Sequence, residues 1–218
     1  MAACEIVERV RTDFDPAVLP PRDFYRLLTA TVVPRPIAWV SSTSTTGVDN
    51  LAPHSFFTVS CVEPPVVQFT SVGRKDSLRN IEVSREFVIN LAAEPLFEQV
   101  NATGTDFPAD VSEFDAVGVA REASTMVAPP RVAQSPVALE CVLHATVSFG
   151  ESTVVFGRVV FAAVDSAVLD GSHPRIELLR PLSRLGLDEW GTAGEIRHIS
   201  RIPYQSWPGH YRAGTVES

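Results

Sequence analysis

The chain has 218 residues, of which 45% are hydrophobic and 20% charged, which suits one large domain with a buried core. Its 26 acidic residues outnumber its 18 lysines and arginines, and a net charge of −8 argues against a nucleic-acid partner. The three cysteines, Cys4, Cys61 and Cys141, lie too far apart for a disulfide framework or a zinc cluster.

The first fifteen residues mix acids and arginines without the apolar segment of a secretory signal. No later stretch is long and apolar enough to cross a bilayer, so we expect a cytoplasmic protein with no membrane partner. We divide the chain into an N-terminal arm, a main domain and a C-terminal extension, at residues 1–22, 23–190 and 191–218. The domain is expected to open with a short helix over 23–28, capped by Asp23.

Short strands are predicted next, because β-branched and aromatic residues recur between prolines and polar turns. The polar run 43–50 has the composition of a hairpin loop. A second, longer hairpin is predicted around residue 150, with Leu139, Cys141, Leu143, Ala145, Val147 and Phe149 on one face of its first strand. The predicted strands span residues 37–42, 56–61, 66–71, 86–91, 139–149 and 154–164.

Two helices interrupt this pattern, one over 77–85 opened by Asp76 or Ser77, and one over 95–103 stopped by Gly104. The helices do not alternate regularly with strands, which argues against a parallel sheet. We therefore predict a mainly β fold with peripheral helices (α+β), built as a closed antiparallel barrel.

Most motifs of catalysis are missing from the sequence. It contains no phosphate-binding glycine loop, no HExxH and no GxSxG. The five histidines, His54, His144, His173, His198 and His210, never occur at i, i+4 spacing, so no metal site is predicted. Cys61 and Cys141 fall in apolar strands and are expected in the core, as is Trp39.

Two polar segments stand out, at residues 50–57 and 70–77, and both are predicted to be loops. The second places two cations, Arg74 and Lys75, directly before a predicted helix, whose free N–H groups and dipole favour an anion. A phosphate would fit there. The alternative is a capped helix that follows a solvated turn.

Whole segments of the chain resemble the flavin reductase-like family of FMN-binding split barrels. The similarity is carried by PRPIAWV, NLAPHSFF, the break VEPPV and RKDSLRNI, and continues through FVINL, VSEFDAVGV, PPRVAQSPVALEC, VVFGRVV and PLSRLG. These pieces occur in order across residues 24–186. The resemblance implies an FMN-binding split β-barrel that works as a homodimer.

The family's flavin-contacting segments map onto two stretches here. Asn50, Leu51, Ala52, Pro53, His54 and Ser55 would contact the ring edge, and Ser71, Arg74, Lys75, Asp76 and Ser77 the phosphate. His54 replaces a common aromatic residue and is the candidate catalytic group; it would stack on or donate to the flavin, or else be an exposed loop residue. Arg184 would reach FMN or the neighbouring subunit, or form a surface salt bridge.

The function that the resemblance implies is an FMN-dependent oxidoreductase passing hydride from NADH or NADPH to flavin N5. An oxygenase would be a possible recipient of the electrons. Two alternatives stay open: a split-barrel flavoprotein of another oxidoreductase type, and an FMN-binding module without flavin reductase activity. The aromatic C-terminal segment, which includes His198, Trp207, His210 and Tyr211, is expected to pack as an extended arm on the barrel or on a partner subunit.

Overall fold

The structure is a computed structural model that describes residues 10–207. Cys4, His210 and Tyr211 therefore lie outside the described residues. The main strands are β2 (Ala38–Thr43), β3 (Asp49–His54), β4 (Phe57–Cys61), β5 (Val66–Val72), β6 (Glu86–Leu91), β9 (Val137–Phe149) and β10 (Ser152–Val164). The helices are α1 (Pro21–Thr31), α2 (Asp76–Ser84), α3 (Phe97–Ala102), α4 (Glu113–Val117) and α5 (Ile176–Leu179), with 3₁₀ turns η1 (Glu94–Leu96), η2 (Ser166–Val168) and η3 (Tyr204–Ser206).

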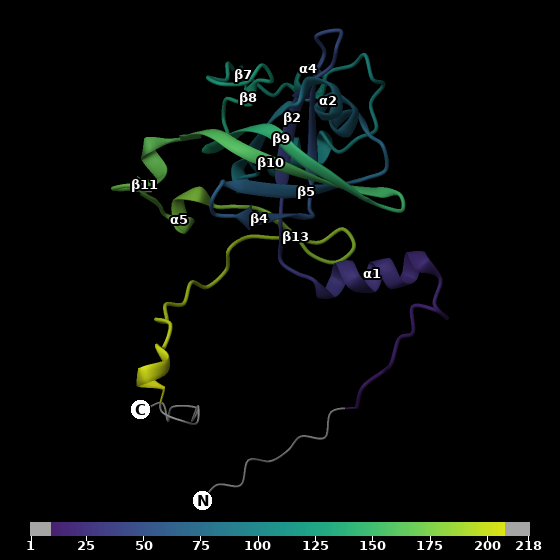
Figure 1. Ribbon diagram of the computed structural model, residues 1–218, viewed down its shortest axis with the longest axis vertical. Helices are drawn as coiled ribbons and strands as arrows, with labels where there is room; N and C mark the ends of the chain where they lie inside the picture. The colour runs from purple at the N-terminus through teal and green to yellow at the C-terminus, as the bar shows by residue number, and fades with distance from the viewer. Residues whose placement is uncertain (1–9, 208–218) are drawn as a thin grey trace, which may run out of the picture.

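The seven main strands form one antiparallel sheet in the order β3-β2-β6-β9-β10-β5-β4. Its two edge strands, β3 and β4, are consecutive in sequence and are separated only by Ser55 and Phe56. A sheet whose opposite edges are joined by two residues must curl back on itself, which gives the split-barrel shape (Figure 1). The predicted mainly β fold with peripheral helices is confirmed.

Short two-residue strands complete the molecule around this sheet. Strands β1 (Arg35–Pro36), β13 (Ser183–Arg184) and β14 (Trp190–Gly191) form a small sheet beneath the barrel. The pairs β7 (Arg121–Glu122) with β8 (Arg131–Val132), and β11 (Leu169–Asp170) with β12 (His173–Pro174), are separate ribbons. The small β1-β13-β14 sheet brings the segment after residue 182 next to the start of the domain.

Apolar side chains fill both faces of β2, because the strand is covered on each side. Ala38 and Val40 belong to the barrel core, which also holds Phe69 and Phe87. Trp39 points the other way into a second cluster with Leu51 and Phe114, under α3 and α4, and its indole donates to Thr103 Oγ1 at 2.8 Å. The predicted burial of Trp39 is confirmed.

The long β9–β10 hairpin extends beyond the barrel. Cys141 and Leu143 lie in the core, and Leu139 packs against it, but Ala145, Val147 and Phe149 on the same face are exposed. The alternation predicted for β9 is therefore correct, whereas burial ends midway because no other layer covers the distal half. Gly157 of β10 lies where the Phe87 ring packs against the backbone and leaves no room for a side chain.

Several expectations about helix ends and cysteines were wrong. Helix α1 begins at Pro21 with Pro20 as its cap, so Asp23 lies inside the first turn. Helix α2 is capped by the backbone of Lys75, and neither Asp76 nor Ser77 caps it with a side chain. Cys61 is exposed because β4 is an edge strand. Cys141 is buried, and burial raises its pKa to about 12.

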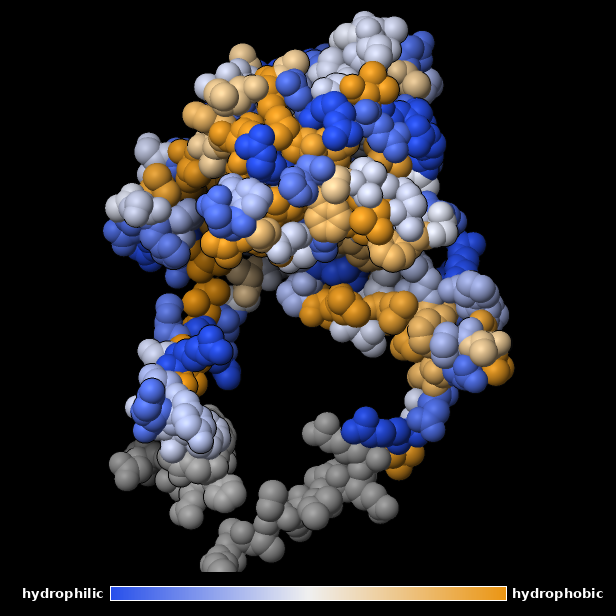
Figure 2. Space-filling model, in the orientation of Figure 1, coloured by the Kyte–Doolittle hydropathy of each residue, from blue (hydrophilic) through white to orange (hydrophobic). Residues whose placement is uncertain are grey.

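The chain ends run away from the barrel. Helix α1 has no buried residue, and both ends of the described chain extend from the same side of the molecule (Figure 1). Ile199, Tyr204 and Trp207 are exposed in the C-terminal segment, which does not pack across the barrel. In Figure 2, apolar side chains also gather over the β9–β10 hairpin and along α1.

Candidate functional site

A cleft of about 380 Å³ lies where the end of β3, the end of β5 and the start of α2 meet. This volume is within the range of small-molecule sites. Tyr25 of α1 and the loop 103–107 close its sides. Of the residues predicted to bind the cofactor, those that line the cleft are Asn50, Ala52, Pro53, His54, Ser55, Arg74, Lys75, Asp76 and Ser77.

Hydrogen bonds join the two predicted segments. The Asn50 amide donates to Ser77 Oγ at 3.0 Å, and His54 Nε2 lies 3.4 Å from the same oxygen. The two segments therefore meet, as the sequence predicted. The first one is not a loop, however: Asn50 to His54 form most of β3, which pairs with β2 along its whole length. Strand pairing fixes this wall of the cleft more rigidly than a loop would.

His54 is buried, with 8% of its surface exposed. Its ring packs on Phe69 with 4.6 Å between the ring centroids. Burial lowers the pKa of His54 to about 4, and the nearby positive charge of Lys75 acts in the same direction, against a hydrogen bond to the Thr70 backbone. The side chain is therefore neutral at pH 7. The alternative of an exposed loop histidine is wrong, because the sheet encloses the end of β3.

The cations at the start of α2 all have protein partners. Arg74 pairs with Glu82 at 2.6 Å and Lys75 with Asp106 at 3.1 Å, while Arg79 pairs with Asp76. An anion bound here must compete with these carboxylates. In its favour, the first turn of α2 has no side-chain cap, so its N–H groups and helix dipole remain available for an anion.

Three predicted residues do not line the cleft. Leu51 points into the core under α4. Ser71 is fully buried, and its hydroxyl donates to the Gly73 carbonyl at 2.9 Å. Arg184 lies outside the cleft, stacked over Trp190 at 4.7 Å from the ring centroid, and it forms no salt bridge among the described residues.

Sequence reasoning missed Glu113, a buried side chain that lines the cleft. Its carboxylate accepts the Leu51 N–H at 2.8 Å, so it satisfies a donor on the free edge of β3. Burial raises the pKa of Glu113. A glutamate at the start of a short helix carries no local signal of this role, since only the tertiary fold brings it to β3.

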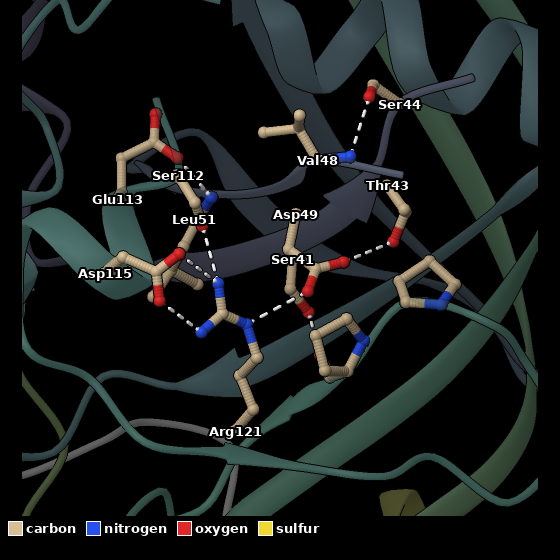
Figure 3. Close-up of polar contacts among 12 residues, drawn as sticks. Ser41, Thr43, Ser44, Val48, Asp49, Leu51, Ser112, Glu113, Asp115 and Arg121 are labelled. Carbon is tan, nitrogen blue, oxygen red and sulfur yellow. Dashed lines mark hydrogen bonds and ion pairs between the residues drawn. The ribbon is translucent and has the colours of Figure 1, made fainter. Parts of the chain in front are cut away.

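Arg121 clamps α4 onto β3 (Figure 3). Its guanidinium pairs with Asp49 at 2.9 Å and with Asp115 at 2.7 Å, and it also donates to Ser112 Oγ at 2.9 Å. The hydrogen bonds from Arg121 lower the pKa of Asp115. This network holds Glu113 against β3, so it supports the wall of the cleft from behind.

The described part of the chain offers neither a metal site nor a helix that could span a membrane. Residues 10–207 contain no group of three or more histidine, cysteine or acidic side chains placed to hold a metal ion. Within the same range, no helix has the length and apolar character needed to span a membrane.

Comparisons with known proteins agree on one family. A family model described as the flavin reductase like domain matches residues 30–179. An uncharacterized protein of Aquifex aeolicus is 39% identical over 168 residues, which cover 74% of this chain and 86% of that protein.

Two solved structures are similar over nearly their whole length. Nitrilotriacetate monooxygenase component B from Bacillus cereus superposes with a TM-score of 0.85 at 28% identity, covering 88% of this chain and all of that one. The 2-nitrobenzoate 2-nitroreductase NbaA of Pseudomonas fluorescens gives a TM-score of 0.83 at 30% identity, covering 93% of this chain and 100% of that one.

Proposed function

The chain belongs to the flavin reductase-like family, and from that premise we propose that it is an FMN-binding, NAD(P)H-dependent flavin reductase. Family membership makes it a flavin-related oxidoreductase. The observation that carries the finer proposal is the convergence of β3 and α2 on one cleft, through the contact of Asn50 and His54 with Ser77.

The cleft has the mixed chemistry that FMN requires. Tyr25, Pro53, Phe56 and Phe107 offer flat or apolar surface for a ring system, and the start of α2 offers N–H groups for a phosphate. Its Arg74 and Lys75 are partly exposed and can exchange Glu82 and Asp106 for a bound anion. These features support FMN over riboflavin, which has no phosphate.

The protein's own residues would bind and orient the ligand. A bound flavin would supply the chemistry of accepting a hydride from a reduced nicotinamide and passing the electrons on, so no catalytic triad is required. His54, which is neutral and held by Ser77 and Phe69, forms a fixed polar wall and does not act as a charged group at pH 7. Glu113 keeps the edge of β3 in place, and Tyr25 and Phe107 limit the entry of water.

A second candidate activity is reduction of a nitroaromatic acid. It is favoured by the similarity to the 2-nitrobenzoate 2-nitroreductase, which extends over 93% of this chain. Both activities use a reduced flavin in the same cleft, so they differ in the final electron acceptor. A binding module without its own reaction is the third possibility.

We also propose partners for the chain. The similarity to a monooxygenase component B supports an oxygenase as recipient of reduced flavin. A homodimer is supported by the exposed Val147, Phe149 and Phe161 of the β9–β10 hairpin. A twofold partner would cover these surfaces.

The test begins with titration of the purified protein by FMN, FAD and riboflavin, followed by absorbance at about 450 nm, a property of the flavin. Oxidation of NADH and NADPH is then measured without flavin, with FMN, and with FMN plus 2-nitrobenzoate. Stimulation by FMN alone supports the reductase, and stimulation only with 2-nitrobenzoate supports the nitroreductase. Failure to bind FMN at micromolar concentration would refute both activities.

A further inference from the structure

Four arginines line a second pocket, of about 290 Å³, between α1 and the loop that follows β13. Arg22 and Arg26 come from α1, Arg35 from β1 and Arg184 from β13. The other lining residues are Tyr25, Thr29, Ser55 and Leu187, so no carboxylate lines the pocket. In a chain with a net charge of −8, four arginines around one pocket form a local concentration of positive charge.

Most of this charge is uncompensated. Arg26 pairs with Asp23 at 3.2 Å, but Arg22, Arg35 and Arg184 form no ion pair with any acidic residue among residues 10–207. Asp188 and Glu189 follow closely in sequence, yet neither pairs with these arginines. The pocket therefore differs from the start of α2, where every cation has a carboxylate partner.

Arg35 adds a buried positive charge to the wall of the pocket. It is only 7% exposed, and its guanidinium donates to the backbone carbonyls of Thr29, Val32 and Leu185. Its Nε has no hydrogen-bond partner. Burial lowers the pKa of Arg35, and the nearby positive charge of Arg184 lowers it further. A bound anion would relieve this repulsion.

The arginine pocket borders the candidate flavin cleft. Tyr25 and Ser55 line both. A third recess, lined in part by Pro53, Ser55 and Arg184, also adjoins them, so Ser55 is common to all three. Figure 1 shows the loop after β13 lying beside α1, below the main sheet. A ligand longer than one ring system can therefore extend from the cleft into the arginine pocket.

We propose that the pocket formed by Arg22, Arg26, Arg35 and Arg184 binds the phosphate groups of the nicotinamide nucleotide while its nicotinamide ring reaches the cleft past Ser55. This inference rests on the proposed function, since it names the site of the electron donor. Guanidinium groups suit it because each can form paired, charge-assisted hydrogen bonds to phosphate oxygens.

The flavin's own phosphate is the other source of the same chemistry. The start of α2 already offers a phosphate site at the cleft, on β3 and α2, whereas the arginine pocket is formed by α1, β1 and β13. We therefore assign the arginine pocket to the nicotinamide nucleotide, and the experiment distinguishes the two sources.

The test is calorimetric titration of the full-length protein with ADP-ribose, which carries the pyrophosphate without a nicotinamide ring, and with inorganic pyrophosphate as competitor. The variant is Arg22→Gln combined with Arg184→Gln, since neither side chain is buried. The matched control is Arg175→Gln with Arg180→Gln, which removes two positive charges at partly exposed sites paired with Glu177 and Glu94, outside both pockets. FMN titration and the unfolding midpoint are measured for each protein.

We expect the double variant to bind ADP-ribose roughly 30-fold more weakly, with FMN affinity within about twofold of wild type and the control unchanged. Unchanged ADP-ribose binding, no binding by wild type, or a loss of FMN affinity alone would each overturn the assignment. Flavin-dependent NADH or NADPH oxidation by wild type tests the proposed function separately. If wild type is a flavin reductase but the double variant binds ADP-ribose as wild type does, only this inference is refuted. If ADP-ribose binding depends on the arginines but the protein shows no flavin-dependent oxidation of NADH or NADPH, only the proposed function is refuted.

Discussion

The buried histidine of the cleft gives a sharp prediction about stability. His54 is neutral in the folded protein because burial lowers its pKa to about 4, whereas in the unfolded chain it titrates near its ordinary value of 6.5. Between these two values the unfolded state binds more protons than the folded state, so stability falls as pH falls. The stability that depends on neutral His54 is fully present above pH 6.5 and is lost progressively as the pH falls to 4.

The magnitude follows from the two pKa values of His54. Between pH 7 and pH 4.5, protonation of His54 in the unfolded chain lowers the free energy of unfolding by about 2 kcal/mol. Carboxylates titrate in the same window, so wild type must be compared with His54→Gln, which keeps a polar side chain but cannot titrate. The difference in unfolding free energy between the two proteins should change by that amount.

Urea unfolding at pH 7, 5.5 and 4.5 measures this difference, at one fixed protein concentration because a dimer would unfold in a concentration-dependent way. Direct titration of the His54 ring by NMR gives an independent value of its pKa. If the difference between wild type and His54→Gln is independent of pH, or if the ring titrates near 6.5, the burial argument is wrong.

Three further predictions concern the phosphate site, the core and the assembly. Replacing both Arg74 and Lys75 by alanine should reduce the preference for FMN over riboflavin roughly tenfold, as measured by titration with each flavin. The effect is modest because the two side chains are 66% and 57% exposed. An unchanged ratio of affinities would place the phosphate elsewhere. Glu140→Gln should lower the unfolding free energy by about 3 kcal/mol, since it leaves the buried Arg131 with only the exposed Glu122, 3.5 Å away, as a charge partner. A loss under about 1 kcal/mol in urea unfolding would contradict this. Light scattering should find two chains per particle; FMN-loaded monomers would exclude a site that needs both subunits.

The Glu140 prediction depends on contacts that bring three segments together. The carboxylate is fully buried and accepts N–H groups from Thr125 at 2.8 Å and Met126 at 2.5 Å, as well as from Arg131. Burial opposes its ionisation, but these donors together hold the pKa of Glu140 below its ordinary value. A neutral amide accepts such bonds more weakly, so the variant loses both charge and geometry.

The sequence by itself was sufficient for features that depend on neighbouring residues. A run of β-branched and aromatic residues predicted β6 at its observed bounds. Alternation of apolar side chains predicted the first strand of the β9–β10 hairpin, because a strand turns successive side chains to opposite faces. The helix predicted over 77–85, opened by Asp76 or Ser77, matches α2 within one residue at each end. The ordered motifs from residue 24 to 186 predicted the family that the comparison then found.

Tertiary structure decided what local pattern cannot encode. The segment Asn50–His54 reads as a polar loop, yet it is a strand because β2 supplies its hydrogen-bond partners, and the curled sheet then buries His54. Cys61, like Cys141, was expected in the core, but it is exposed because β4 is an edge strand of the sheet. The arginine pocket joins residues from 22 to 184, which only the pairing of β1 with β13 brings together. Burial and charge at these sites depend on contacts between distant segments, whereas periodicity reports only which side chains share a face.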